Sequence, residues 1–131
     1  MIYADANVII RLLAGLPAVR APIEIRLLPF KGMLGFLATS RLSRLECRAK
    51  PLRAGDTALL ALYDAFLASA EVVLLEIDAA VVDKATELRA GLNVKTPDAI
   101  HLASAVLAKA TSFLTGDRAL QRCTEVVVEI V

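Results

Sequence analysis

Residues 1–9, Met1-Ile2-Tyr3-Ala4-Asp5-Ala6-Asn7-Val8-Ile9, lead from one apolar run through an acid into a second apolar run. Met1 to Ala4 has the length and the side chains of a buried strand, whereas Val8 to Leu13 has the character of an apolar helix. This junction predicts a strand that is followed closely by a helix. Asp5 would then lie at the carboxyl end of the strand.

Short apolar runs of the same kind recur along the chain, and the segments between them have helical periodicity. The runs are Gly35 to Ala38, Val72 to Leu75, Ser112 to Leu114 and Val126 to Ile130. Strands that alternate with helices are typical of a parallel sheet covered by helices. We therefore expect an α/β fold with a central, mainly parallel sheet.

Several helix starts are marked by residues that can cap a helix. Asp78 is placed to cap a helix over Ala79 to Ala90. Thr96-Pro97-Asp98 predicts another helix, with Thr96 as its N-cap, Pro97 at its first position and Asp98 in its first turn. A further helix is expected over Asp56 to Ala70, whose apolar side chains share one face. They are Leu59, Leu62, Tyr63, Phe66 and Leu67.

The length and composition fit one domain over residues 1–131. A 14.0 kDa chain that is 57% hydrophobic can bury one core but is short for two ordinary domains. The mean hydropathy is +0.63, yet no uninterrupted apolar run reaches the roughly 20 residues of a membrane-spanning helix. Because no basic segment precedes an apolar one at the amino terminus, we expect a cytoplasmic protein with no membrane partner.

The two cysteines, Cys47 and Cys123, form no CxxC pair and are accompanied by a single histidine, His101. Neither a zinc site nor a disulfide framework is indicated by this pattern. Buried free thiols are the preferred interpretation.

Charge is divided unevenly along the chain. Residues 1–55 carry nine Lys/Arg against three acids, a net charge of +6, whereas residues 56–131 carry six against eleven, a net charge of −5. Many of the cations lie between Arg41 and Arg53. Such a cluster could bind a polyanion, or it could be an ordinary solvated helix face, and charge alone does not separate the two interpretations.

Two acids directly follow expected strands. Asp5 follows the first strand, and Asp117 follows the strand Ser112 to Leu114 through the turn Thr115-Gly116. Ligands of open parallel sheets bind beyond the carboxyl ends of the strands, so both acids would point into such a site. Each could instead be a simple N-cap of the next helical segment.

Two further acids lie on expected helices. Asp98 could bind a ligand or merely interact with the helix dipole. Glu46 lies at the edge of the apolar stripe of a helix that opens at Ser40, and its alternatives are a salt bridge to a nearby arginine or a capping box with Ser43, which a start at Ser40 excludes. The side chains expected to be buried in this stripe are Leu42, Leu45 and Ala49.

Carboxylates gathered in one cleft repel one another, and divalent cations relieve that repulsion. Because the candidate ligands are all oxygen atoms, Mg²⁺ or Mn²⁺ is the expected cofactor. Asn7 and Thr115 lie near the same strand ends and could orient water, or could simply make turns. His101 follows Asp98 by one turn and could touch a phosphate, but a lone histidine is more often a satisfied helix residue, so we leave it outside the catalytic set.

Four segments resemble, in order and spacing, the motifs of the PIN-domain family, and especially its VapC-type toxins of type II toxin-antitoxin systems. They are Tyr3-Ala4-Asp5-Ala6-Asn7-Val8-Ile9, Ser40-Arg41-Leu42-Ser43-Arg44-Leu45-Glu46, Thr96-Pro97-Asp98-Ala99-Ile100-His101-Leu102-Ala103 and Leu114-Thr115-Gly116-Asp117-Arg118. The resemblance covers nearly the whole chain. Ala6 departs from the Thr or Ser that is frequent there, and residues 15–35 fit no family pattern.

The resemblance implies a three-layer α/β/α sandwich and a metal-dependent endoribonuclease that hydrolyses RNA by metal-activated water. Asp5, Glu46, Asp98 and Asp117 would hold the ions. The resemblance also implies a homodimer and inhibition by a small antitoxin protein that inserts a tail near the acids.

Arg41, Arg44 and Arg48 are our candidates for steering the RNA. Two rival functions remain open. Asp5 could be the nucleophile of a Mg²⁺-dependent phosphatase, although no second acid follows it at the expected position. Alternatively, the chain could be a non-catalytic PIN-like module that binds RNA or a protein.

Overall fold

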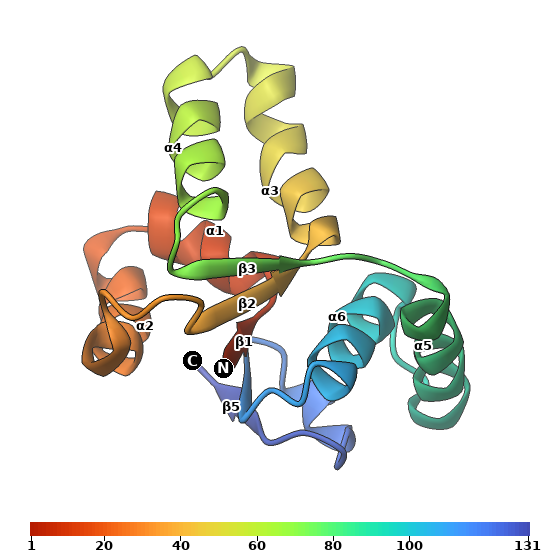
Figure 1. Ribbon diagram of the computed structural model, residues 1–131. Coiled ribbons are helices and arrows are strands. Elements are labelled where there is room, and N and C mark those ends of the chain that lie inside the picture. Colours follow the sequence, from red (N-terminus) through yellow and green to blue (C-terminus); the bar gives the residue numbers. More distant parts are fainter.

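The computed structural model describes residues 1–131, in which five strands alternate with helices (Figure 1). The elements are β1 (Ile2–Ala4), α1 (Ala6–Ala14), α2 (Pro17–Leu27), η1 (Leu28–Phe30), β2 (Leu37–Ser40), α3 (Arg41–Ala54), α4 (Thr57–Leu67), β3 (Val72–Leu75), α5 (Ala79–Leu92), α6 (Thr96–Leu107), β4 (Ser112–Thr115), η2 (Arg118–Arg122) and β5 (Val128–Ile130), where η denotes a 3-10 helix.

The five strands form one sheet in the order β3-β2-β1-β4-β5, and every neighbouring pair is parallel. Tyr3 of β1 is in register with Ala38 on one side and with Phe113 on the other. The chain builds the sheet outward from β1 in one direction and then returns to add β4 on the opposite side. This reversal leaves a crevice beyond the carboxyl ends of β1 and β4, where ligands of open α/β sheets bind.

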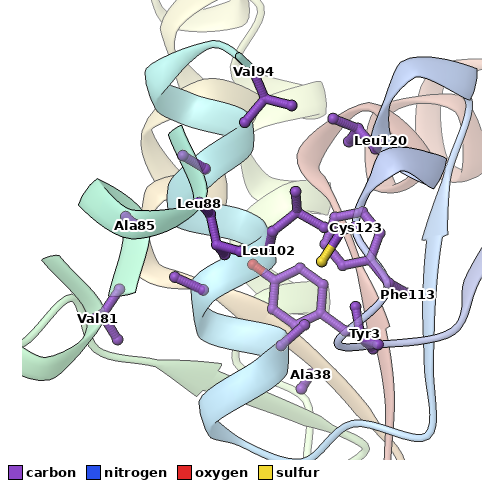
Figure 2. Packing of buried hydrophobic residues seen from close by; sticks show 14 residues of the cluster. Tyr3, Ala38, Val81, Ala85, Leu88, Val94, Leu102, Phe113, Leu120 and Cys123 are labelled. Carbon is purple, nitrogen blue, oxygen red and sulfur yellow. The ribbon is translucent and has the colours of Figure 1, made fainter. Parts of the chain in front are cut away.

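Helices cover both faces of the sheet, so the expected three-layer α/β/α sandwich is confirmed (Figure 1). Successive side chains of a strand point to opposite faces. Tyr3 therefore packs with α5 and α6, among Leu102, Phe113 and Cys123 (Figure 2), whereas Ile2 and Ala4 pack with α1 to α4. No helix has both the length and the apolar character needed to cross a membrane.

Several expected boundaries are confirmed. Ser40 caps α3, because its Oγ accepts a hydrogen bond from Leu42 N at 3.0 Å. Asp56 and Asp78 cap α4 and α5 in the same way, with Oδ1 accepting from the backbone at 3.0 and 2.9 Å. Because α3 starts at Ser40, the alternative capping box at Ser43 is excluded.

Several expected boundaries are wrong. The helix expected over Asp56 to Ala70 ends at Leu67, and the strand expected from Val126 begins at Val128, because the chain bends at residues 125–126.

The second strand begins at Leu37, because Gly35 has a left-handed φ of 60° and its N–H donates to Ala70 O, which makes residues 35–36 a turn. Helix α6 begins one residue earlier than expected, with Lys95 as its N-cap and no capping side chain. Thr96 is therefore its first helical residue, and Asp98 still lies in the first turn.

The expected buried face of α3 is also wrong. Its buried residues are Ser43, Cys47 and Pro51, whereas Leu45 is 64% exposed. The reason is a polar contact: Thr39 Oγ1 lies 2.6 Å from Ser43 Oγ, which turns this face of α3 toward the sheet. The predicted members Leu42 and Ala49 are half-buried and exposed, respectively.

On α4 the expected apolar face is narrower than predicted. Tyr63 and Leu67 are buried and Leu59 and Phe66 pack partly against them, but Leu62 is 45% exposed. Residues 15–35, which fitted no family pattern, form α2 and η1.

Candidate functional site

Asp5 and Asp117 both lie at the crevice beyond β1 and β4. Asp5 is 6% exposed, and its Oδ1 accepts a hydrogen bond from Val8 N at 2.9 Å. Asp117 is exposed, and its Oδ1 accepts from Ala119 N at 2.9 Å. Both acids are therefore N-caps, as their simpler interpretation predicted. This role occupies only one oxygen of each carboxylate and leaves Oδ2 without a hydrogen bond.

Glu46 is joined to a buried histidine. His101 Nε2 lies 2.7 Å from Glu46 Oε1, and His101 Nδ1 lies 2.7 Å from the hydroxyl of Tyr3. His101 is 3% exposed, whereas the Glu46 side chain is 31% exposed. The partner of Glu46 is therefore the histidine of α6, and not one of the arginines near it on α3.

Helix α3 is held against the start of α1 in a way that brings Glu46 near Asp5. Thr39 Oγ1 donates to Ala4 O at 2.7 Å and contacts Ser43. One turn later, the Cys47 thiol is buried 4.0 Å from Ala6 O. Burial raises the pKa of Cys47 to about 12, and the negative charges of Glu46 and Asp5 add to this effect.

The negative charges of all three other acids act on the carboxyl group of Asp98. Its pKa is raised, first by burial, then by the negative charge of Asp117 and, more weakly, by those of Asp5 and Glu46, while His101 opposes the shift. Asp98 itself makes no hydrogen bond through its side chain. The fold thus brings the four sequence-predicted acids into one electrostatic group.

These acids fit a hard divalent cation chemically, because they offer only carboxylate oxygens around a region of uncompensated negative charge. They do not form a complete metal site, because no three acidic, histidine or cysteine side chains lie close enough together to coordinate one ion. Asp5, Glu46 and Asp117 each have one carboxylate oxygen in a hydrogen bond and one without, and the second oxygen of each would be the metal ligand.

Asn7 and Thr115 differ in accessibility. Thr115 is fully buried, and its Oγ1 accepts a hydrogen bond from Asp117 N at 3.1 Å, so it orients the turn that carries Asp117. Asn7 is exposed and lines a hollow of about 550 Å³ together with residues that include Arg11, Asp117 and Arg118.

The three arginines predicted to steer RNA are engaged in ion pairs. Arg41 pairs with Glu76. Arg44 Nη1 lies 3.1 Å, and Arg48 Nε 2.8 Å, from the same oxygen of Asp64. The two arginines therefore share one acid, which leaves a net positive charge on this part of α3.

Sequence reasoning missed the contact between Tyr3 and His101, the contact between His101 and Glu46, and the place of Arg11 in the hollow beside Asp117. His101 follows Asp98 by one helical turn, and Tyr3 is a polar side chain within an otherwise apolar strand, so both gave a weak signal that a buried polar pair was needed. Arg11 gave no comparable signal.

Comparison with known proteins gives a family and a fold. A family model described as the PIN domain matches residues 2–126. No curated protein sequence gives a significant match.

Similar solved structures include VapBC from Salmonella typhimurium bound to DNA, with a TM-score of 0.78 and 17% identity over 98% of this chain and 96% of that one. VapBC2 from Rickettsia felis, bound to a DNA fragment from their promoter, has a TM-score of 0.76 and 18% identity over 98% of both chains. A toxin-antitoxin complex from Klebsiella pneumoniae has a TM-score of 0.72 and 20% identity over 97% of this chain and 96% of that one.

Proposed function

This chain belongs to the PIN domain family, and from that premise we propose that it is a Mg²⁺- or Mn²⁺-dependent endoribonuclease, the toxin of a toxin-antitoxin pair. The observation that carries the proposal is the cluster of four acids at the crevice beyond the carboxyl ends of β1 and β4. In this cluster, burial and the negative charges of Asp117, Asp5 and Glu46 raise the pKa of Asp98. Metal-dependent nucleases use such a concentration of carboxylates to gather cations around a phosphodiester.

Asp5, Glu46, Asp98 and Asp117 would hold the ion or ions, each through a carboxylate oxygen that makes no hydrogen bond within the protein. When bound, the metal neutralises the phosphodiester and promotes attack by water. Hydrolysis joins the water oxygen to phosphorus and breaks the bond to the 3′ oxygen, leaving a 5′-phosphate and a 3′-hydroxyl.

The chain's own residues hold this site in place. Thr115 fixes the turn before Asp117, and His101 fixes Glu46. Arg41, Arg44 and Arg48 would attract RNA at long range, because Arg44 and Arg48 share a single acid and keep an excess positive charge.

A protein partner is supported by an apolar pocket on another part of the surface. This pocket of about 510 Å³ is lined mainly by apolar side chains of α1, α2, η1, α4 and the amino ends of β2 and β3, among them Leu12, Leu27 and Phe66. The nearby side chains of Leu28 and Leu34 are also exposed. Since one similar structure is a toxin-antitoxin complex, we propose that an antitoxin binds this surface. We also propose that the protein is cytoplasmic and forms a homodimer.

The test is cleavage of an end-labelled, mixed-sequence RNA by purified protein with Mg²⁺, with Mn²⁺ or with EDTA. We expect metal-dependent cutting by the wild type and its loss in Asp5→Asn and Asp98→Asn. Asp78→Asn is the matched control, because Asp78 caps α5 through Oδ1 at 2.9 Å, as Asp5 caps α1, but does not act on Asp98.

Equal cutting by Asp5→Asn, Asp98→Asn and Asp78→Asn would overturn the assignment. Release of phosphate from a small phosphomonoester without RNA cleavage would favour the phosphatase instead. RNA binding without any hydrolysis would favour a non-catalytic module.

A further inference from the structure

A hollow beside Asp117 lies next to the proposed carboxylate site, and the proposed function gives it no role. It has a volume of about 550 Å³ and is lined by Asn7, Ile10, Arg11, Gly116, Asp117, Arg118 and Val131. Two of these side chains are guanidinium groups, and one is a carboxylate. The side chains of the hollow therefore carry two positive charges against one negative charge, which belongs to Asp117, one of the four acids.

Arg11 has an unsatisfied donor at this place. Its Nη1 donates to Val131 O at 2.8 Å, whereas its Nη2 is buried and has no hydrogen-bond partner. The turn at Gly116 covers this atom, and a Cβ at that position would lie 2.9 Å from Nη2. A buried donor left unpaired costs about 1–3 kcal/mol, more for a charged group, so such atoms often mark functional sites.

The other polar side chains of the hollow are also free. Arg118 is exposed and makes no ion pair or side-chain hydrogen bond, and the same holds for the amide of exposed Asn7. This contrasts with Arg41, Arg44 and Arg48, all of which are paired with acids. Arg118, directly after Asp117 in the chain, is therefore an arginine beside the acids that has no intramolecular partner.

We propose that this hollow binds a phosphate group of the RNA backbone, next to the phosphodiester that is cut. A phosphate offers several acceptor oxygens and two adjacent guanidinium groups bind it through paired N–H donors. Arg118 and Asn7 line the hollow as exposed side chains, and Arg11 lines it beside Gly116. This inference rests on the proposed ribonuclease function.

The experiment measures binding of a fluorescently labelled single-stranded RNA in EDTA, by anisotropy, over a series of salt concentrations. For single strands the logarithm of the binding constant falls with the logarithm of salt concentration with a slope of about −0.7 per phosphate contact. Because both guanidinium groups would bind the same phosphate, we expect the double variant to make this slope shallower by about 0.7 and Arg118→Gln or Arg11→Gln alone to account for part of that change. Lys109→Gln is the control, because Lys109 is an exposed cation without an ion pair that lies before the amino end of β4, outside the hollow and outside the basic cluster of α3.

Arg118→Gln keeps the test valid even if Arg11→Gln unfolds, because the Arg118 side chain has no intramolecular partner to lose. Slopes for Arg118→Gln that equal those of Lys109→Gln, or a wild type that does not bind RNA, would overturn the subsite. Metal-dependent cleavage is measured separately on the same RNA. Normal cleavage by the wild type with unchanged slopes rejects only the subsite, whereas shallower slopes without cleavage reject only the nuclease.

Discussion

The imidazole of His101 lies between two polar groups, with Nε2 2.7 Å from Oε1 of Glu46. A carboxylate only accepts hydrogen bonds, so Nε2 must carry the proton. In the neutral ring Nδ1 is then an acceptor, and the Tyr3 hydroxyl, 2.7 Å away, donates to it. Burial raises the pKa of Tyr3, which keeps this hydroxyl protonated. The chain Tyr3–His101–Glu46 therefore fixes the ring and, through it, the carboxylate.

Tyr3→Phe tests this chain. The variant keeps the ring stacked on Phe113 but leaves His101 Nδ1 without a donor. We expect the free energy of unfolding to fall by about 1 kcal/mol. Because the imidazole could then turn away from Glu46, Mn²⁺ affinity should fall about tenfold, as measured by paramagnetic resonance of free Mn²⁺.

Tyr63→Phe is the matched control for that measurement. Tyr63 is buried, like Tyr3, but its hydroxyl has no hydrogen-bond partner in the protein. Its removal should leave Mn²⁺ affinity unchanged. Equal affinities for Tyr3→Phe and the wild type would mean that Glu46 is positioned without help from the chain.

Asp98→Asn is expected to stabilise the metal-free protein at neutral pH. The pKa of Asp98 is raised, mainly by burial and by Asp117, so the folded state disfavours the charged carboxylate. Because the pKa of Asp98 is higher in the folded protein than in the unfolded chain, the folded state loses stability as the pH rises and Asp98 ionises. The neutral amide side chain of the variant cannot ionise, so the variant avoids this loss. Chemical denaturation of both proteins in EDTA, from acidic to neutral pH, measures the difference.

Addition of Mn²⁺ should make the wild type more stable than Asp98→Asn. A ligand at one hundred times its Kd stabilises the folded state by about 2.7 kcal/mol, and only the wild type keeps the carboxylate that binds it. Asp83→Asn, which changes an exposed acid on α5, should behave as the wild type does in both conditions. If Asp98→Asn were less stable than the wild type in EDTA, the acids would not repel one another as argued.

Much of the fold and the identity of the acids could be predicted because both depend on local sequence. The junction of an apolar run with Asp5 requires only nine residues to recognise, and the caps at Ser40 and Asp78 are set by neighbouring backbone N–H groups. Parallel strands then bring their carboxyl ends to one edge. Asp5 and Asp117 are thus predictable without knowledge of the packing.

What could not be predicted depends on partners far apart in the chain. His101 and Glu46 are 55 residues apart and meet only because α3 and α6 pack around β1 and β2. The buried face of α3 was predicted from its leucines, but the polar pair Thr39–Ser43 decides it. Arg44 pairs with Asp64 of the next helix, so its charge could not be assigned to RNA from the sequence.

Cys47 should be inert in the native protein. Burial and the nearby acids raise its pKa to about 12, so almost no thiolate forms near pH 8, and its surface is covered. In a Cys123→Ala background, reaction with a disulfide reagent should occur only as fast as the protein unfolds. Reaction within seconds under native conditions would contradict the packing of α3 on α1; denatured protein serves as the positive control.

Glu129 stabilises the fold in a pH-dependent way. Its carboxylate accepts from Arg26 Nε at 2.7 Å and Nη2 at 2.9 Å, and Arg26 lowers its pKa to about 2. Because an unfolded Glu titrates near pH 4.3, this stability is complete above that pH and is lost as the pH falls toward 2. Glu129→Gln should therefore lower the free energy of unfolding by about 1–2 kcal/mol at pH 7. Urea denaturation should show that the difference in this free energy between variant and wild type becomes smaller below about pH 4.3. Glu24→Gln, which breaks only an exposed pair with Arg20, should cost less than about 0.5 kcal/mol, and an equal loss in both variants would contradict a special role for Glu129.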